Sequence, residues 1–150
     1  MTTLDELDRE VRFRIYRAFA DTGRAPTDDT LAAETGASAG EVASALDRLA
    51  ASRAIVLAPG TRNLWMAHPF SAVPTPFPVR TARRTYWANC AWDALGVAAL
   101  IDEDAVSETQ CPDCGEALVL RVTDGRVSPG DGVVHFHVPP KRFWENVGFT

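Results

Sequence analysis

Asn89-Cys90-Ala91-Trp92-Asp93 opens an apolar run that ends at Ile101, and this stretch decides how the second half of the chain folds. The run predicts a buried helix. Residues i and i+3 lie on one face of a helix, so the Cys90 thiol and the Asp93 carboxylate can approach the same bound atom. A soft-metal ligand and a proton donor would then meet in one pocket.

Three β-rich runs follow this helix and predict an antiparallel sheet wrapped around it. They span residues 106–111, 117–122 and 133–138, and turn signals separate them at residues 112–115, 124–125 and 128–132. The last residues, Val147-Gly148-Phe149-Thr150, are an apolar run that we expect to continue as a strand.

The first third of the chain predicts three short helices and a β-hairpin, which is the order of elements in a winged helix. A capping box formed by Ser38 and Glu41 starts the third helix. The predicted helices span residues 4–22, 26–36 and 38–53, and the strands 55–57 and 64–66 flank a turn-rich loop.

The charge of this region argues against DNA binding. Residues 1–67 contain eight arginines and ten acidic residues, and the formal charge of the whole chain is -5. Phosphate neutralisation supplies most of the non-specific affinity for DNA. We therefore expect a structural or partner-packing role for the three helices, and no general affinity for nucleic acid or for a membrane surface.

The predicted fold class is α+β, with a winged-helix-like domain over residues 1–67 and an α+β domain over residues 83–150. Between them, residues 68–82 form a connector with four prolines in residues 69–78. We expect it to lie extended over a surface, held by Phe70 and Phe77.

Three arginines follow the prolines, and two interpretations of them stay open. They form a solvated rim, or they create a positive field beside Cys90 that favours its thiolate. The three residues are Arg80, Arg83 and Arg84.

Composition predicts a soluble cytoplasmic protein with an ordinary core. Hydrophobic residues make up 46% of the chain, yet no stretch of about 18 apolar residues is present to span a bilayer. The N-terminus lacks the basic and apolar regions of a signal peptide. In this setting we expect the three cysteines to be thiols or metal ligands and not disulfides.

Cys90 and Asp93 each allow a structural interpretation beside the chemical one. Cys90 is either a small buried hydrophobe or a soft-metal ligand. Asp93 either offsets the helix dipole or, protonated and partly buried, acts as a proton donor. His135 could approach Cys90 in space, although a Cys-His pair has little support in the sequence.

A second group of metal-ligand residues lies further along the chain. Cys111-Pro112-Asp113-Cys114 has the shape of half a zinc ribbon. His135 and His137 would share one face of a strand and complete a Cys2His2 zinc site if the two elements adjoin. The four tryptophans are interpreted as core or pocket-lining residues; they are Trp65, Trp87, Trp92 and Trp144.

These features together resemble the organomercurial lyase (alkylmercury lyase) family. The resemblance rests on residues 89–96, 111–122 and 134–136 with the prolines that follow, and on the winged-helix-like N-terminal part. It implies protonolysis of a carbon–mercury bond, giving a hydrocarbon and Hg(II), and hence a role in mercury resistance. Cys90 would bind the mercury and Asp93 would move a proton from a thiol to the departing carbon.

The family also uses a second active-site cysteine, which by the resemblance would fall at or just beyond Phe149-Thr150. This chain has no cysteine there, and a second thiol from Cys111 or Cys114 is a hypothesis; the resemblance implies a structural role for Cys111 and no role for Cys114. No cofactor is required; a zinc ion at Cys111 and Cys114 stays open from their spacing, and the resemblance implies Hg(II) as the bound product. The implied partners are a small organomercurial or other soft-metal ligand, and a thiol reductant or a mercury-accepting protein.

Two other functions stay open. One is a non-catalytic protein that binds Hg, Cu or Zn through Cys90. The other is a winged-helix module for regulation or interaction.

Overall fold

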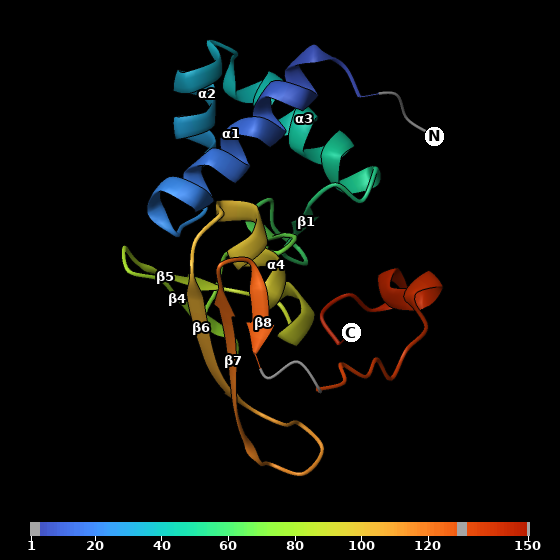
Figure 1. The fold of residues 1–150 in the computed structure, drawn as a ribbon. Helices are drawn as coiled ribbons and strands as arrows, with labels where there is room; N and C mark the ends of the chain where they lie inside the picture. Colours follow the sequence, from blue (N-terminus) through green and yellow to red (C-terminus); the bar gives the residue numbers. More distant parts are fainter. Residues whose placement is uncertain (1–3, 129–131, 150) are drawn as a thin grey trace.

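Side-chain caps define the N-terminal helices of this computed structural model, which describes residues 4–128 and 132–149. Asp5, Thr27 and Ser38 accept hydrogen bonds from the first turns of three helices. These are α1 (Glu6–Thr22), α2 (Asp28–Thr35) and α3 (Ala39–Ala51) (Figure 1). The three predicted helices and the capping box at Ser38 are confirmed.

A three-stranded antiparallel sheet follows the helices, in the order β1-β2-β3. Its strands are β1 (Val56–Leu57), β2 (Leu64–Ala67) and β3 (Phe70–Ser71). The predicted hairpin is therefore present as β1 and β2. The third strand comes from the segment that was expected to be a connector.

The second sheet is fully antiparallel, in the order β5-β4-β6-β7-β8. Between β5 and β6 the chain forms α4 (Ala91–Ile101), which packs against β4 and β7. The predicted helix and the two predicted strands at residues 106–111 and 117–122 are confirmed. The strands are β4 (Pro78–Arg80), β5 (Thr85–Trp87), β6 (Ala105–Gln110), β7 (Ala117–Thr123) and β8 (Arg126–Ser128).

The prediction of a strand at residues 133–138 is wrong. Residues 132–138 have no strand, and the chain continues into a short 3-10 helix, η1 (Pro140–Glu145). β8 already occupies the edge of β7, and Pro139 and Pro140, which directly follow the predicted strand, have no N–H to donate to a ladder. Residues 147–149 form a turn instead of a strand. Residues 129–131 of the predicted turn, and Thr150, lie outside the described residues.

Phe70 is the centre of one continuous hydrophobic core that reaches from α1 to α4. It is fully buried, stacks on Phe19 of α1 at 5.0 Å and lies 5.7 Å from the Tyr86 ring. The two ends of the proline-rich segment are therefore built into the two sheets, as β3 and β4, while Val73 between them is exposed. Burial of a large aromatic ring explains this, because it outweighs the loss of ladder donors at the prolines. Phe77 packs against the same core, as predicted.

No helix among residues 4–128 and 132–149 has both the length and the apolar character needed to cross a membrane.

Candidate functional site

Two distant segments are joined where β3 meets the chain after β5. An isolated antiparallel bridge links Phe70 to Ala88. The Asn89 side-chain amide donates hydrogen bonds to the carbonyl oxygens of Pro69 and Phe70, both at 3.2 Å. The turn between β2 and β3 therefore lies beside the residues that start α4.

A glycine lets α4 approach this turn closely. A Cβ atom at Gly96 would lie only 3.2 Å from Cβ of Pro69, tighter than an ordinary contact. The first turns of α4 thus pack directly on the segment that carries His68.

Cys90 is the N-cap residue of α4, and its Sγ accepts a hydrogen bond from the Asp93 backbone N–H at 3.4 Å. Burial, followed by the negative charge of Asp93, raises the pKa of the Cys90 thiol. The Asp93 and Trp92 backbone N–H groups act in the opposite direction but are weaker. Cys90 is therefore a neutral thiol near neutral pH, and any ligand that binds the thiolate must displace its proton.

The idea of a positive field beside Cys90 is wrong. Arg80 pairs with Glu108, Arg83 pairs with Glu103, and Arg84 donates to the backbone carbonyl of Asp21. Burial and then the Asp93 charge dominate at Cys90, so the pKa of its thiol rises instead of falling.

The Asp93 carboxylate has the polar partners that its burial requires. Its Oδ2 lies 3.2 Å from His68 Nδ1 and accepts a hydrogen bond from Asn89 Nδ2 at 3.1 Å. The Asp93 side chain is 15% exposed and that of His68 is 38% exposed. Thiol, carboxylate and imidazole therefore form a continuous polar row at the start of α4.

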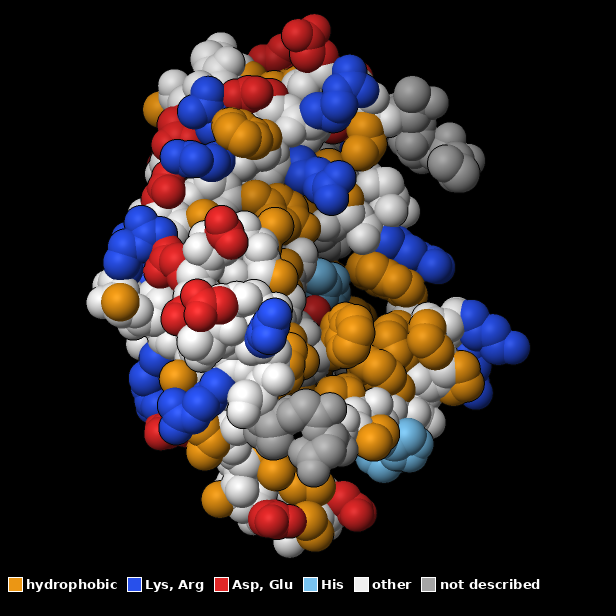
Figure 2. All heavy atoms as spheres, in the orientation of Figure 1, with side chains coloured by type: hydrophobic (Ala, Val, Ile, Leu, Met, Phe, Trp, Pro, Cys, Tyr) orange, Lys and Arg blue, Asp and Glu red, His pale blue; other side chains and the backbone are white. Residues whose placement is uncertain are grey.

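The C-terminal segment lies against this row. The Trp144 ring meets the His68 ring edge-on at 6.1 Å, and the Arg53 guanidinium lies 5.5 Å from the Trp144 ring centre. A Cβ at Gly148 would lie 2.5 Å from the Trp65 ring, so that glycine is in direct contact with it. Figure 2 shows hydrophobic side chains gathered over this segment, beside a hollow that separates it from the body of the molecule.

The four tryptophans differ in their surroundings. Trp65 and Trp144 are partly buried and pack at the C-terminal segment, and Trp87 lines a cavity. Trp92 is 61% exposed, so the prediction that it is a core residue is wrong. It points outward because the buried positions of α4 are Ala94, Val97 and Ala98.

His68, Asn89 and Trp144 are the site residues that the sequence did not reveal. His68 stands 25 residues before Asp93, at the edge of the proline-rich segment, with no spacing pattern to link the two. The histidine considered as a partner for Cys90 was His135, which instead lies 5.2 Å from His137 ring to ring. Asn89 adjoins Cys90 in the motif, and its buried Oδ1 has no hydrogen-bond partner.

The Cys111–Cys114 turn lies apart from this site. It closes the β6–β7 hairpin, whose tip extends away from α4 (Figure 1). Among the residues that the structure describes, no group of three or more His, Cys, Asp or Glu side chains could hold a metal ion. The two cysteines and the pair His135 and His137 are therefore not assembled into a four-ligand site.

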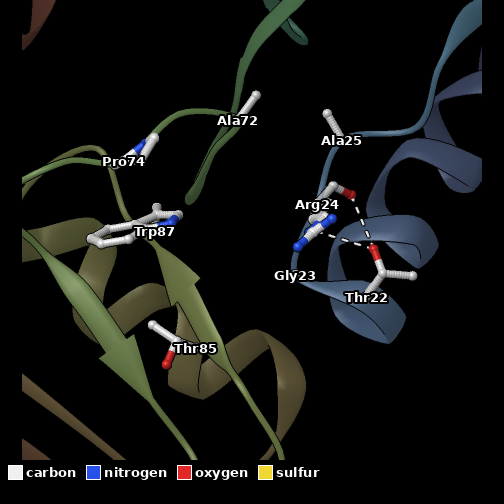
Figure 3. A pocket seen from close by; sticks show the side chains of 8 residues that line it. All are labelled: Thr22, Gly23, Arg24, Ala25, Ala72, Pro74, Thr85 and Trp87. Carbon is white, nitrogen blue, oxygen red and sulfur yellow. Dashed lines mark hydrogen bonds between the residues drawn. The ribbon is translucent and has the colours of Figure 1, made fainter.

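A separate cavity of about 480 Å³ opens between the end of α1 and β5. Trp87 and Thr85 line one side and Thr22 to Ala25 line the other, where Thr22 and Arg24 hydrogen-bond to each other (Figure 3). Neither Cys90, Asp93 nor His68 lines it. Because it offers no thiol or carboxylate, the reactive row at α4 is the stronger candidate for chemistry.

Comparisons with known proteins match the part of the chain that carries Cys90 and Asp93, and His68 lies just before the residues that the family model matches. The family model described as MerB, alkylmercury lyase, matches residues 70–150. Among solved structures, the mercury-bound form of MerB2 matches with a TM-score of 0.70 and 25% sequence identity, over 84% of this chain and 60% of that chain. No curated protein matches. The chain thus spans less than two thirds of the MerB2 chain, and by the family match over more than half its length it belongs to the alkylmercury lyase family.

Proposed function

We propose that this chain cleaves a carbon–mercury bond by protonolysis, with Cys90 as the mercury ligand and Asp93 as the proton donor. One observation carries the proposal. A carboxylate adjoins a partly buried neutral thiol at the start of α4, inside the segment that matches the family model.

The first step is capture of the organomercurial cation. Mercury is soft and binds thiolate in preference to water or carboxylate. The Cys90 S–H bond breaks, its sulfur bonds to mercury, and the proton passes to the Asp93 carboxylate. The raised pKa of Cys90 means that the proton is present on the thiol when the substrate arrives.

The second step breaks the carbon–mercury bond. The electron pair of that bond stays on the carbon, which takes the proton from Asp93 and leaves as a hydrocarbon. Mercury(II) stays on Cys90. A second thiolate on the mercury would push electron density toward the carbon and make it more basic.

We assign that second thiolate to a small-molecule thiol, because Cys111 and Cys114 lie at the far end of a hairpin. The same thiol, or a mercury-accepting protein, would remove the Hg(II) product. No resident cofactor is part of this proposal.

A second function is supported by the presence of a single thiol in the reactive row. With one sulfur ligand, the chain would hold a soft metal at Cys90 without cleaving anything. Hydrocarbon release distinguishes the two functions.

The winged-helix interpretation of the N-terminal part belongs here as a proposal. Three helices followed by a three-stranded antiparallel sheet fit it. Arg48 is engaged by Asp5 and Asp8, Arg62 by Asp47, and Arg53 by Trp144. These arginines are already paired within the chain, so we propose that α3 packs the fold and does not bind DNA.

The test is an anaerobic incubation with phenylmercury and excess thiol, following benzene release. Cys90→Ser and Asp93→Asn should each abolish release, and Cys111→Ser with Cys114→Ser should not. Asp47→Asn, which removes a surface carboxylate of α3, is the matched control and should release benzene normally. Tight mercury binding without benzene from the unaltered chain would replace this proposal with the binding function.

A further inference from the structure

We propose that His68 is a positioning residue that holds, through Asp93, the proton released by Cys90 until the carbon–mercury bond breaks. This inference rests on the proposed function. It names a residue that neither the motif at α4 nor the family match assigns to the reaction.

The reaction has a step at which its proton can be lost. Between capture and cleavage the proton must stay near the carbon, yet an ordinary carboxylic acid gives up its proton to water at neutral pH. Imidazole titrates near neutrality and retains a proton far better under the same conditions. A carboxyl group with an imidazole beside it therefore keeps the proton in the site.

The geometry suits such sharing. His68 Nδ1 and Asp93 Oδ2 lie 3.2 Å apart, so one proton can sit on either atom along the same line. With the proton on Nδ1, the imidazole donates to the carboxylate. With the proton on Oδ2, the carboxyl group donates to the imidazole. Neither state requires a side chain to move.

Asn89 leaves this proton position available. Its amide nitrogen faces four acceptors, the carbonyls of Pro69 and Phe70, Asp93 Oδ2 and His68 Nδ1, at 3.1–3.3 Å. An amide has only two N–H groups. The two carbonyls and the ionised Asp93 carboxylate can only accept, so these three acceptors already outnumber the N–H groups and fix which way the amide points. His68 Nδ1 is then not required to accept from Asn89.

The surroundings of His68 hold it in place and expose it toward solvent. Tyr16 of α1 donates a hydrogen bond to its backbone carbonyl at 2.9 Å, and Trp144 packs edge-on against its ring. The charged and titratable groups around it are Asp93 on α4, Tyr16 on α1, and Arg53 beyond Trp144. At 38% exposed, the imidazole reaches solvent more readily than Asp93 at 15%.

The proton balance closes within the pair. The Cys90 S–H bond breaks as sulfur bonds to mercury, and the proton passes through Asp93 to His68 Nδ1. At cleavage the N–H bond breaks, Asp93 regains the proton at Oδ2, and the carbon receives it with the electron pair of the carbon–mercury bond. His68 ends neutral and Asp93 ends ionised, ready for the next thiol.

The experiment compares His68→Asn and His68→Ala with the unaltered chain, using phenylmercury, excess thiol and benzene release. Asparagine can still donate a hydrogen bond to Asp93 but cannot store a proton, so it separates storage from simple orientation. We expect kcat to fall about 10- to 100-fold in both variants, within the range for general acid–base groups, with KM little changed.

Added imidazole provides the deciding control. It should restore kcat of His68→Ala, whose missing ring leaves a solvent-accessible gap, and should not restore Asp93→Asn. Full kcat in His68→Asn, or no restoration of His68→Ala, would overturn the inference while leaving the proposed function standing. No benzene from the unaltered chain would overturn both, and that failure is visible before any variant is made.

Discussion

The raised pKa of Cys90 leads to a prediction about its reactivity. Burial is the larger cause and the Asp93 charge is the second, so Asp93→Asn removes one cause and leaves the other. The backbone N–H of residue 93 would still donate to the sulfur. The variant should therefore have a more reactive thiol, in contrast to its expected loss of benzene release.

The size of the effect follows from the position of the charge. The Asp93 backbone nitrogen lies 3.4 Å from Cys90 Sγ, and the carboxylate is on the same residue. Two unit charges about 5 Å apart repel by roughly 1–3 kcal/mol between the dielectric of water and that of a protein surface. Because about 1.4 kcal/mol is a tenfold change in an equilibrium constant, the thiolate fraction of Cys90 at neutral pH should rise about tenfold.

The assay is the rate of iodoacetamide alkylation at Cys90, measured by mass spectrometry of the peptide that contains it. Cys114, which is exposed on the β6–β7 turn, is an internal control whose rate should not change in the same sample. Asp47→Asn is the matched carboxylate control. An equal or slower rate at Cys90 in Asp93→Asn, with an unchanged rate at Cys114, would refute the assignment of the Asp93 charge as a cause of the raised pKa.

Two further predictions concern stability and the C-terminal segment. Asp8 is fully buried; burial alone would raise the pKa of its carboxyl group, but hydrogen bonds from Arg48 and from the Asp5 backbone lower it overall. A carboxyl group with a lowered pKa stabilises the fold at pH values above its ordinary pKa near 4, and this stabilisation is lost as the pH falls. The free energy of unfolding, measured with urea, should therefore drop less between pH 7 and pH 3 in Asp8→Asn than in the unaltered chain. Gly148→Val should weaken docking of the C-terminal segment by roughly 1–3 kcal/mol, because a Cβ there meets the Trp65 ring at 2.5 Å. Limited proteolysis should then cleave the segment that follows residue 131 faster in Gly148→Val than in the control Gly132→Val, whose added side chain enters open space. Equal cleavage rates in the two variants would contradict the contact between Gly148 and Trp65.

Local features of the fold could be predicted because they depend on neighbours in the chain. Ser38 and Glu41 form a capping box within one turn, and Gly23 and Gly36 end their helices in the left-handed conformation. Residues 133–138 have the composition of a strand but do not form one. Composition cannot show whether a segment pairs with a sheet edge: β8 is the last strand of its sheet, yet residues 132–138 do not pair with it.

The candidate site also combines a local part that the sequence predicts with contacts from distant residues that it does not predict. Its core, Cys90 with Asp93, lies within three residues, so the N-cap geometry at the start of α4 brings thiol and carboxylate together without help from the rest of the chain. The partners of Asp93 come from elsewhere: His68 from the turn between β2 and β3, and Trp144, which packs on His68, from η1. These contacts exist only once Phe70 is buried between α1 and β5 and bridges Ala88.

By itself the sequence determined the helix ends, the two long strands and the pairing of a thiol with a carboxylate, because each is decided within a few residues of backbone. Only the tertiary structure decided that the arginines would pair with other groups, that burial would raise the pKa of Cys90, and that a histidine 25 residues distant would stand beside Asp93. The physical reason is burial. Burial of Phe70 and the apolar face of α4 in one core brings His68 next to Asp93. No spacing of residues along the chain predicts this contact.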